Sequence, residues 1–299
     1  MRSAGEKSSW RFGEGEELAP GRYVSRLLGG GRRYEAYLAW DDELYTLVVA
    51  KIVRPGLVDH HPTLDGLASE ARALRALAHP IIVRSFDAVL DGDRPHLVLE
   101  HLDGPRLSTL IRRYAVVVEQ LLPLVLELSS ALHYMHGRGY LHLDVKPRNV
   151  VMSARPRLID LSIATTIEDA RALPNPVGTD AYMAPEQCVP AQFGELGPRT
   201  DIWGLGATMY EALARRPVFV SSADERHPQL RIRPLPLPKS VPPELSDVVL
   251  ACLEASPKNR PRAAELAALV EPWSATLPAP RLGLFRPGSG RQRTAYAVG

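Results

Sequence analysis

Residues 142–149 read His-Leu-Asp-Val-Lys-Pro-Arg-Asn, and this stretch decides how the rest of the chain is interpreted. It places a carboxylate, Asp144, close to the ammonium of Lys146 and the amide of Asn149. The stretch belongs to a loop-rich region, residues 140–187, that separates two strongly apolar helix patterns. A connection of this length is unusual in a compact domain, and such loops are generally functional or disordered. The polar residues of this loop are therefore the first candidates for chemistry.

The spacing of His142, Asp144 and Asn149 matches a protein-kinase catalytic loop, which reads H-R-D followed by N. With this loop, the chain resembles the eukaryotic-like serine/threonine protein kinases found in bacteria. The resemblance implies that Asp144 orients the acceptor hydroxyl and serves as its base, and that Asn149 holds Mg²⁺. It also implies that Lys146 marks serine/threonine rather than tyrosine specificity. Leu143 departs from the family, because it replaces the usual arginine.

Asp160-Leu161-Ser162 follows the catalytic loop at the place where the family has D-F-G. The resemblance makes Asp160 the second Mg²⁺ ligand, and a carboxylate is the hard ligand that this ion prefers. Leu161 can fill the apolar role of the phenylalanine. Ser162 lacks the freedom of glycine at positive φ, so we expect flipping of this turn to be restricted.

Residues 178–186, Gly-Thr-Asp-Ala-Tyr-Met-Ala-Pro-Glu, resemble the end of the kinase activation segment with its A-P-E motif. Asp201 matches the start of the central helix of the large lobe, and Arg260 is the expected buried partner of Glu186. These three residues are assigned structural roles. Small-molecule kinases of related shape generally lack these features, so the features favour a protein substrate.

Lys51 ends the segment Val48-Val49-Ala50-Lys51, which resembles the V-A-I-K strand of kinases. The resemblance predicts that its ammonium bridges the α- and β-phosphates of ATP and pairs with Glu70 on the following helix. The alternative interpretation is a solvated lysine at a strand edge.

Three consecutive glycines before Tyr34 resemble the Gly-rich loop over the ATP phosphates, where glycine lets the backbone approach closely. Tyr34 stands at the third glycine position, which weakens the match, and the segment taken alone favours a plain turn over a phosphate-binding loop. At two positions that cover adenine, the family usually has Val where this chain has Ala36 and Ala where it has Val49. The exchange roughly conserves volume. The residues predicted to surround ATP are Leu28, Gly29, Gly30, Gly31, Ala36, Val49, Lys51, Glu70, Glu100, Leu102 and Val151.

The candidate phosphorylation sites are Thr165, Thr166 and Thr179. In many kinases the arginine that Leu143 replaces binds a phosphorylated residue of the activation segment. Without that cation a phosphate here has no such partner, so we expect activity to be independent of the usual phosphothreonine switch.

The predicted fold class is α+β, a bilobal kinase-like arrangement with a small antiparallel-sheet lobe and a larger, mainly helical lobe. We assign residues 20–273 to the kinase domain, with lobes over 20–100 and 104–273, and we expect flexible arms over 1–19 and 274–299. Apolar spacing predicts strands over 34–39, 45–53, 81–90 and 96–100, a helix over 67–78, and large-lobe helices over 121–136, 203–213, 245–253 and 263–269.

The composition is that of a globular protein: of 299 residues, 45% are hydrophobic and 23% charged. A net charge of +2 is too balanced to imply a nucleic-acid partner. The two cysteines cannot build a disulfide framework. The sequence shows neither a signal peptide nor an apolar run of about 20 residues, so we expect a cytoplasmic chain without membrane insertion.

The sequence therefore predicts a serine/threonine protein kinase that uses ATP and Mg²⁺, with Mn²⁺ as an alternative. Its expected partners are protein substrates and a regulatory protein. A pseudokinase that serves as a nucleotide-binding scaffold or signalling partner is the alternative, supported by Leu143, Ser162 and Tyr34, although none of these removes a phosphate or metal ligand.

Overall fold

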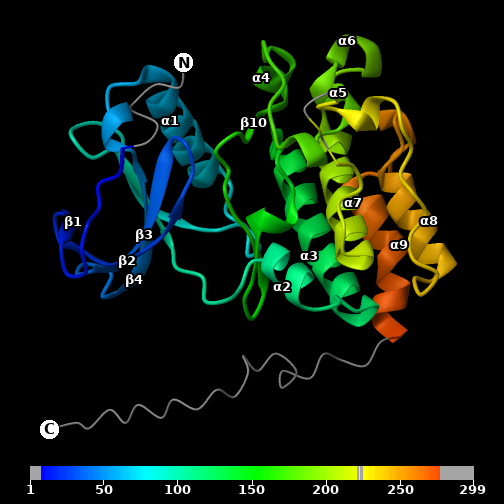
Figure 1. Ribbon diagram of the computed structural model, residues 1–299, viewed down its shortest axis with the longest axis horizontal. Coiled ribbons are helices and arrows are strands. Elements are labelled where there is room, and N and C mark those ends of the chain that lie inside the picture. The colour runs from blue at the N-terminus through cyan, green and yellow to red at the C-terminus, as the bar shows by residue number, and fades with distance from the viewer. Residues whose placement is uncertain (1–7, 221, 223–224, 277–299) are drawn as a thin grey trace, which may run out of the picture.

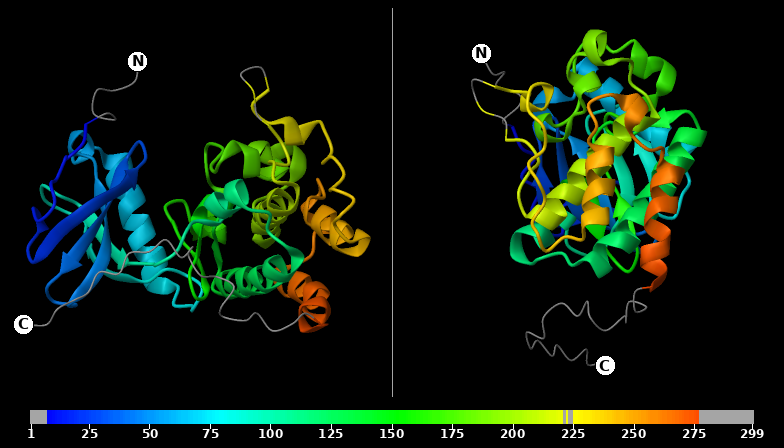
Figure 2. Two further views of the ribbon diagram at one scale, coloured as in Figure 1. Left: turned by 60° about the horizontal axis from the view of Figure 1, so that its bottom comes forward. Right: turned by 90° about the vertical axis from the view of Figure 1, so that its right-hand side faces the viewer.

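The computed structural model describes residues 8–220, 222 and 225–276. They form two lobes, a smaller one around an antiparallel sheet and a larger, mainly helical one (Figure 1). In Figure 1 and in the left view of Figure 2, α1 (His61–Ala76) lies on the side of the sheet that faces the helical lobe. The predicted α+β class and bilobal arrangement are confirmed.

Six strands form the sheet of the small lobe, in the order β1-β2-β3-β4-β6-β5, and all neighbouring pairs are antiparallel. Along β4 the residues Val48, Ala50 and Ile52 are buried, whereas Val49 and Lys51 are half-buried. Because side chains alternate between the two faces of a strand, Val49 and Lys51 share one face. The strands are β1 (Glu17–Ala19), β2 (Arg22–Gly30), β3 (Tyr34–Asp41), β4 (Thr46–Val53), β5 (Ser85–Val89) and β6 (His96–Glu100).

The buried residues of α1 include Thr63, Leu67, Glu70, Ala71 and Leu74. Their spacing of three and four residues places them on one helical face, which packs against the sheet. Glu70 is the one ionisable side chain among the buried residues of α1, and a buried carboxylate needs a partner. The helix begins six residues before the predicted start.

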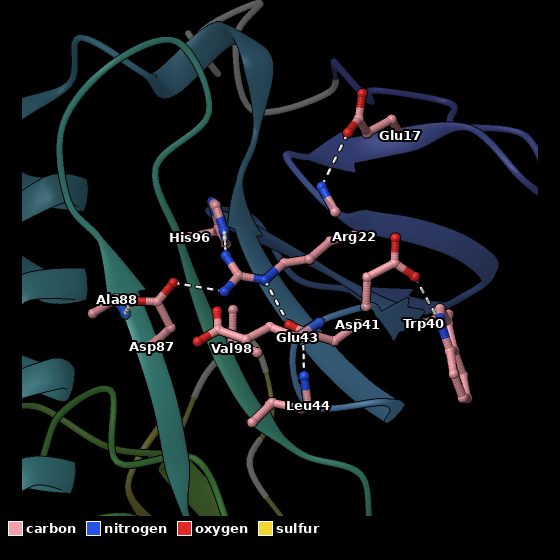
Figure 3. Close-up of polar contacts among 12 residues, drawn as sticks. Glu17, Arg22, Trp40, Asp41, Glu43, Leu44, Asp87, Ala88, His96 and Val98 are labelled. Atoms are coloured by element: carbon pink, nitrogen blue, oxygen red, sulfur yellow. Dashed lines mark hydrogen bonds and ion pairs between the residues drawn. The ribbon is translucent and has the colours of Figure 1, made fainter.

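An ion-pair network ties four strands of the sheet together around Arg22 (Figure 3). Its guanidinium contacts Asp41 of β3 at 2.8 Å and Asp87 of β5 at 2.7 Å, and its Nη1 lies 3.4 Å from Nε2 of His96 in β6. Asp41 also accepts hydrogen bonds from the backbone N–H groups of Glu43 and Leu44, so it fixes the β3–β4 turn as well.

The prediction of a flexible arm over residues 1–19 is wrong for residues 8–19. Trp10 stacks on Phe12 at a centroid distance of 5.6 Å, and Phe12 meets the ring of Tyr37 edge-on at 5.5 Å. The indole N–H of Trp10 donates to the carbonyl of Val53 at 2.8 Å, and Leu18 is buried. These apolar side chains cover a face of the sheet, a contact that local polarity does not indicate. Residues 1–7 lie outside the described residues.

The large lobe is built around α7 (Pro198–Ala214), in which residues 201–210 are all buried. A helix that is apolar all round belongs in a protein interior. Trp203 stacks on Phe219 at 5.9 Å, and α9 packs along α3. The other helices are α2 (Leu107–Arg113), α3 (Val118–Gly137), α4 (Ile167–Arg171), α5 (Pro185–Cys188), α6 (Pro190–Phe193), α8 (Pro243–Cys252) and α9 (Ala263–Thr276).

The loop-rich region contains two short ladders. β7 (Tyr140–Leu141) pairs with β10 (Thr165–Thr166), and β8 (Val150–Met152) pairs with β9 (Pro156–Leu158). Both ladders are too short to be recognised in the sequence from alternating apolar and polar residues. The β7–β10 ladder joins the residues just before the catalytic loop to the segment after Asp160, and the β8–β9 ladder directly follows the catalytic loop.

Two predicted boundaries differ from the structure. The strand predicted over 81–90 is limited to β5, because Ile81 and Val83 instead exchange backbone hydrogen bonds with Leu158 at the junction of the lobes. Residues 274–276, predicted to be flexible, continue α9, and residues 277–299 lie outside the described residues. Among the described helices, none combines the length and the apolar character that crossing a membrane requires.

Candidate active site

The catalytic loop is held by the first turn of α7. The buried carboxylate of Asp201 accepts hydrogen bonds from the backbone N–H groups of His142 and Leu143, at 3.0 and 2.7 Å, and from Nε2 of His136 at 2.9 Å. Burial alone would raise the pKa of Asp201, but these hydrogen bonds and the nearby histidines hold it below its ordinary value. Leu143 has a φ of 62°, which is strained for a residue with a side chain. The strain persists because the amides on both sides are held: the N–H of Leu143 donates to Asp201, and the N–H of Asp144 donates to Nδ1 of His142 at 3.2 Å.

The next turn of α7 lies directly against this loop. A Cβ on Gly204 would stand 2.8 Å from the carbonyl oxygen of Val145, which is too close for any other residue. The loop thus rests on the buried part of α7, and such support by a regular helix is what a precisely positioned site requires.

Asp144 lies at the centre of a polar cluster that joins three of the predicted catalytic residues. Its Oδ2 is 2.5 Å from Nζ of Lys146 and accepts a hydrogen bond from Nδ2 of Asn149 at 3.0 Å. The hydroxyl of Thr179 donates to Oδ1 of Asp144 at 2.8 Å, and Nζ of Lys146 donates to the same hydroxyl oxygen at 2.6 Å. A neutral hydroxyl is therefore held between a carboxylate and an ammonium.

Lys51 makes the contacts expected of a phosphate-binding lysine. Its Nζ donates to both carboxylate oxygens of Glu70, at 2.9 and 2.7 Å, and to Oδ1 of Asp160 at 2.9 Å. Burial would lower the pKa of Lys51, but the two carboxylates together raise it above its ordinary value. The alternative of a solvated lysine is wrong, because the side chain is only 14% exposed and doubly paired.

Asp160 has a φ of 66°, so the positive backbone angle in this turn falls on the aspartate and not on Ser162. Serine at that position therefore carries no backbone strain. Burial would raise the pKa of Asp160, but the charge of Lys51 and hydrogen bonds from Lys51 and Ser162 hold it well below its ordinary value. The carboxylate is ionised throughout the physiological range.

Asn149 and Asp160 suit a hard divalent cation. Asn149 uses its amide nitrogen for both of its hydrogen bonds to Asp144, which leaves the amide oxygen as a ligand. Its backbone carbonyl accepts from the N–H of Ile159 at 2.9 Å, so the two ligand-bearing segments are adjacent. The carboxylate of Asp160 is 38% exposed and ionised. One carboxylate with a neutral oxygen is a donor set typical of Mg²⁺ bound together with phosphates.

The other residues predicted to surround ATP come from both lobes. In the sheet, Ala36 pairs with Lys51, and Val49 pairs with Leu99. Glu100 ends β6, and its side chain turns to Arg157 at 2.7 Å. The remaining positions are the exposed or half-buried Leu28, Gly29, Gly30 and Gly31 of the β2–β3 hairpin, the half-buried Leu102 after β6, and the buried Val151 of β8.

Leu143 belongs to an apolar cluster, which we call the segment cluster. Its buried members are Leu141, Leu143, Ala170 and Leu196, and Ile163, Ile167, Leu173 and Val177 pack against them. Where many kinases place an arginine, this chain thus packs the segment after Asp160 by hydrophobic contact. Of the candidate phosphorylation sites, Thr166 caps α4 by accepting from the N–H of Asp169 at 3.1 Å, whereas Thr179 is engaged by Asp144.

Glu186 and Arg260 form the pair that the sequence predicted. Both side chains are fully buried, and the two guanidinium–carboxylate contacts measure 2.6 and 2.8 Å. Gln187 is a residue that sequence reasoning missed. Its Nε2 donates to the carbonyls of Leu143 and Val177, both at 2.9 Å, so it joins the catalytic loop to the activation segment. Its position directly after A-P-E was the available signal.

Comparison with known proteins agrees with this geometry. A family model described as the protein kinase domain matches residues 23–273. The serine/threonine-protein kinase PknB of Mycobacterium leprae is 31% identical over 249 residues, which cover 78% of this chain and 40% of that protein. The serine/threonine-protein kinase pkn2 of Myxococcus xanthus is 32% identical over 290 residues, covering 90% of this chain and 34% of that protein.

The chain thus spans less than half the length of these curated relatives. The family match nevertheless includes both lobes and every residue of the Lys51 and Asp144 clusters. The chain belongs to the protein kinase family, and bacterial serine/threonine protein kinases are among its relatives.

Proposed function

We propose that the chain is a serine/threonine protein kinase, which transfers the γ-phosphoryl group of ATP to serine and threonine hydroxyls of protein substrates. The observation that carries the proposal is the hydroxyl of Thr179, held 2.8 Å from Asp144 and 2.6 Å from Lys146. An acceptor hydroxyl in the same place would have its proton directed at a carboxylate and its oxygen beside an ammonium.

In this mechanism Asp144 accepts the hydrogen bond of the acceptor hydroxyl and takes its proton as the hydroxyl oxygen bonds to the γ-phosphorus of ATP. The bond from that phosphorus to the bridging oxygen of the β-phosphate breaks at the same time, and ADP leaves. Lys146 stabilises the negative charge that develops around the reacting oxygens. Asn149 holds Asp144 in place through its amide nitrogen. Such positioning and electrostatic stabilisation make up most of the catalysis in phosphoryl transfer.

On the nucleotide side, Lys51 would exchange its contact with Asp160 for the α- and β-phosphates while it keeps Glu70. Asn149 and Asp160 would hold Mg²⁺, with Mn²⁺ as the alternative ion. When bound, the ion neutralises phosphate charge.

The partners that this function implies are protein substrates and a regulatory protein, and we place the chain in the cytoplasm. The buried Glu186–Arg260 pair supports a protein rather than a small-molecule substrate, because the resemblance ties this pair to protein kinases. The net charge of +2 gives no support to a nucleic-acid partner.

The test is phosphate transfer from labelled ATP to a generic basic protein, with Mg²⁺ and with Mn²⁺, and mapping of the label by mass spectrometry. Asp144→Asn keeps the size of the side chain and removes the base, and should slow transfer by about 10²- to 10⁴-fold. Asp247→Asn, the same change at an exposed position of α8, is the matched control and should leave the rate unchanged. Label on tyrosine, or ATP binding without transfer, would contradict the proposal and favour the scaffold function.

A further inference from the structure

Tyr34, the first residue of β3, stands where the family resemblance expects a glycine, and its side chain has a defined place. The hydroxyl donates to the backbone carbonyl of Thr63, in the first turn of α1, at 2.8 Å. The ring lies under the ammonium of Lys51, which is 5.0 Å from the ring centroid, a cation–π arrangement. Tyr34 therefore contacts both α1 and the lysine whose partner α1 carries.

Gly66 of α1 explains how the tyrosine fits. A Cβ at this position would stand 2.9 Å from the hydroxyl oxygen of Tyr34, closer than real Cβ contacts come, and the next nearest atom is 3.9 Å away. Glycine is unfavourable inside a helix, so its presence there needs a reason. The space that it leaves is the space that the Tyr34 hydroxyl uses, and these two unusual residues account for each other.

The contacts made by Tyr34 and Lys51 act on one face of α1. Thr63 and Glu70 are seven residues apart, about two helical turns, and both are buried on the face that meets the sheet. On the sheet side, Lys51 pairs with Ala36, two residues after Tyr34, so Tyr34 and Lys51 project from the same face. Two attachments at different heights fix the rotation of a helix as well as its distance.

We propose that Tyr34 is a positioning residue, which holds α1 against the sheet and thereby keeps Glu70 within reach of Lys51. Burial raises the pKa of Tyr34, so the hydroxyl remains a donor at neutral pH. Both attachments of α1 come from strands of the small lobe: Tyr34 of β3 bonds the carbonyl of Thr63, and Lys51 of β4 bonds Glu70.

Amide hydrogen exchange of residues 61–76 tests this directly on the free chain. Tyr34→Phe removes only the hydroxyl, and exchange through opening of α1 should become about fivefold faster, the factor expected for one typical net hydrogen bond. Tyr37→Phe is the matched control, because this tyrosine lies in the same strand on the opposite face and bonds Glu35 instead. Equal exchange of α1 in wild type and Tyr34→Phe would overturn the proposal.

The partnership with Gly66 gives a second test. Gly66→Ala should speed exchange of α1 in the wild type, because the new methyl displaces the hydroxyl. In the Tyr34→Phe background the same change should not speed exchange and should slow it, because alanine favours the helix and no oxygen is displaced. An equal effect of Gly66→Ala in both backgrounds would show that the two residues are not coupled.

The consequence for catalysis rests on the proposed function. If the chain transfers phosphate, Tyr34→Phe should lower kcat/KM for ATP by about the same fivefold factor, and Tyr37→Phe should leave it unchanged. Should wild type transfer no phosphate while the exchange results hold, the proposed function fails and the role of Tyr34 in placing α1 stands. Unchanged kcat/KM in an active Tyr34→Phe chain would overturn the link to catalysis.

Discussion

Arg260 shows how a charge is accommodated in the interior of the large lobe. Its guanidinium donates to both oxygens of Glu186 and to the backbone carbonyls of Arg199, Glu254 and Ala255. These contacts use all five donors of the side chain. The carboxylate of Glu186 accepts a further hydrogen bond from Thr200 at 2.9 Å. Because every group is satisfied, the buried pair is tolerated although neither partner reaches water.

Removing one member of this pair should therefore be severely destabilising. Arg260→Ala leaves Glu186 buried without its counter-charge, and we expect the free energy of unfolding to fall by about 3–5 kcal/mol. Urea unfolding measures this loss. The control is Arg155→Ala, whose ion pair with Glu127 is largely exposed and should contribute about 0–1 kcal/mol. Losses of equal size in the two variants would contradict the structural role of Glu186–Arg260.

At the scale of elements, the segment between Asp160 and Glu186 is placed by contacts that need no phosphate. Leu143 and its neighbours in the segment cluster hold one part of it, and Gln187 bonds the carbonyl of Val177. The short ladder of β7 and β10 holds its beginning. An order that arises from packing and backbone pairing does not depend on modification.

Replacement of Thr165 and Thr166 should accordingly leave turnover within about twofold, if the substitutions respect the local structure. Thr165→Val suits a strand position, and Thr166→Asn keeps a side chain that can cap α4 while it removes the phosphorylatable hydroxyl. Steady-state phosphate transfer by the double variant is the measurement. A collapse of turnover, with normal secondary structure by circular dichroism, would show that a phosphothreonine switch operates after all.

The free energy of unfolding should depend on pH through His96, which lies in β6 of the sheet. Burial lowers the pKa of His96, so the folded state binds fewer protons than the unfolded state, whose histidine titrates near pH 6.5. The free energy of unfolding should therefore fall as the pH is lowered from about 7 to 5, by about 1.4 kcal/mol for each unit of pKa shift. Arg22 opposes protonation of the ring and Asp87 favours it.

Comparing the free energy of unfolding of His96→Gln with that of wild type between about pH 7 and 5 isolates the contribution of His96 to the pH dependence. Glutamine can still accept from Arg22 but does not titrate, so the variant should show the shallower slope. Part of the slope should remain, because burial also lowers the pKa of His79. Identical slopes would mean that His96 keeps its ordinary pKa in the folded chain.

At the scale of the whole molecule, the site lies where the lobes meet. Lys51 of the small lobe bonds Asp160 of the large lobe, and Glu100 bonds Arg157 across the same junction. Ile81 and Val83 add backbone hydrogen bonds to Leu158 there. Figure 1 and the left view of Figure 2 show the two lobes side by side along the long axis, so this junction sets the relation between the groups proposed to bind the nucleotide and those proposed to bind the acceptor.

The sequence was sufficient for the parts of the site that follow from spacing within one segment. The relation of Asp144 to Asn149 is of this kind. Distant partners such as Glu186 and Arg260 were predicted from the resemblance of the chain to known kinases. Contacts between segments with no common motif could not be read in this way. Trp10 and Phe12 look like arm residues until the sheet that they cover is known.

Apparent departures from the family are a second case in which the sequence misleads. Tyr34, Leu143 and Ser162 look like losses when each is compared with a motif position alone. In the fold Tyr34 reaches α1 through the space above Gly66, and Leu143 has apolar neighbours that come from distant segments. The positive φ falls on Asp160, so Ser162 is unstrained. Each outcome depends on a tertiary neighbour that local pattern does not specify.

The groups proposed to bind the nucleotide and the acceptor are assembled in this chain before any phosphorylation. The most direct measurement is the pre-steady-state rate of phosphate transfer to an added protein, using chain treated with phosphatase and shown by mass spectrometry to carry no phosphate. We predict that transfer begins at its full rate, without a lag and with a rate per molecule independent of chain concentration. A lag that shortens as the chain concentration rises, together with phosphate accumulating on residues 163–179, would contradict the claim.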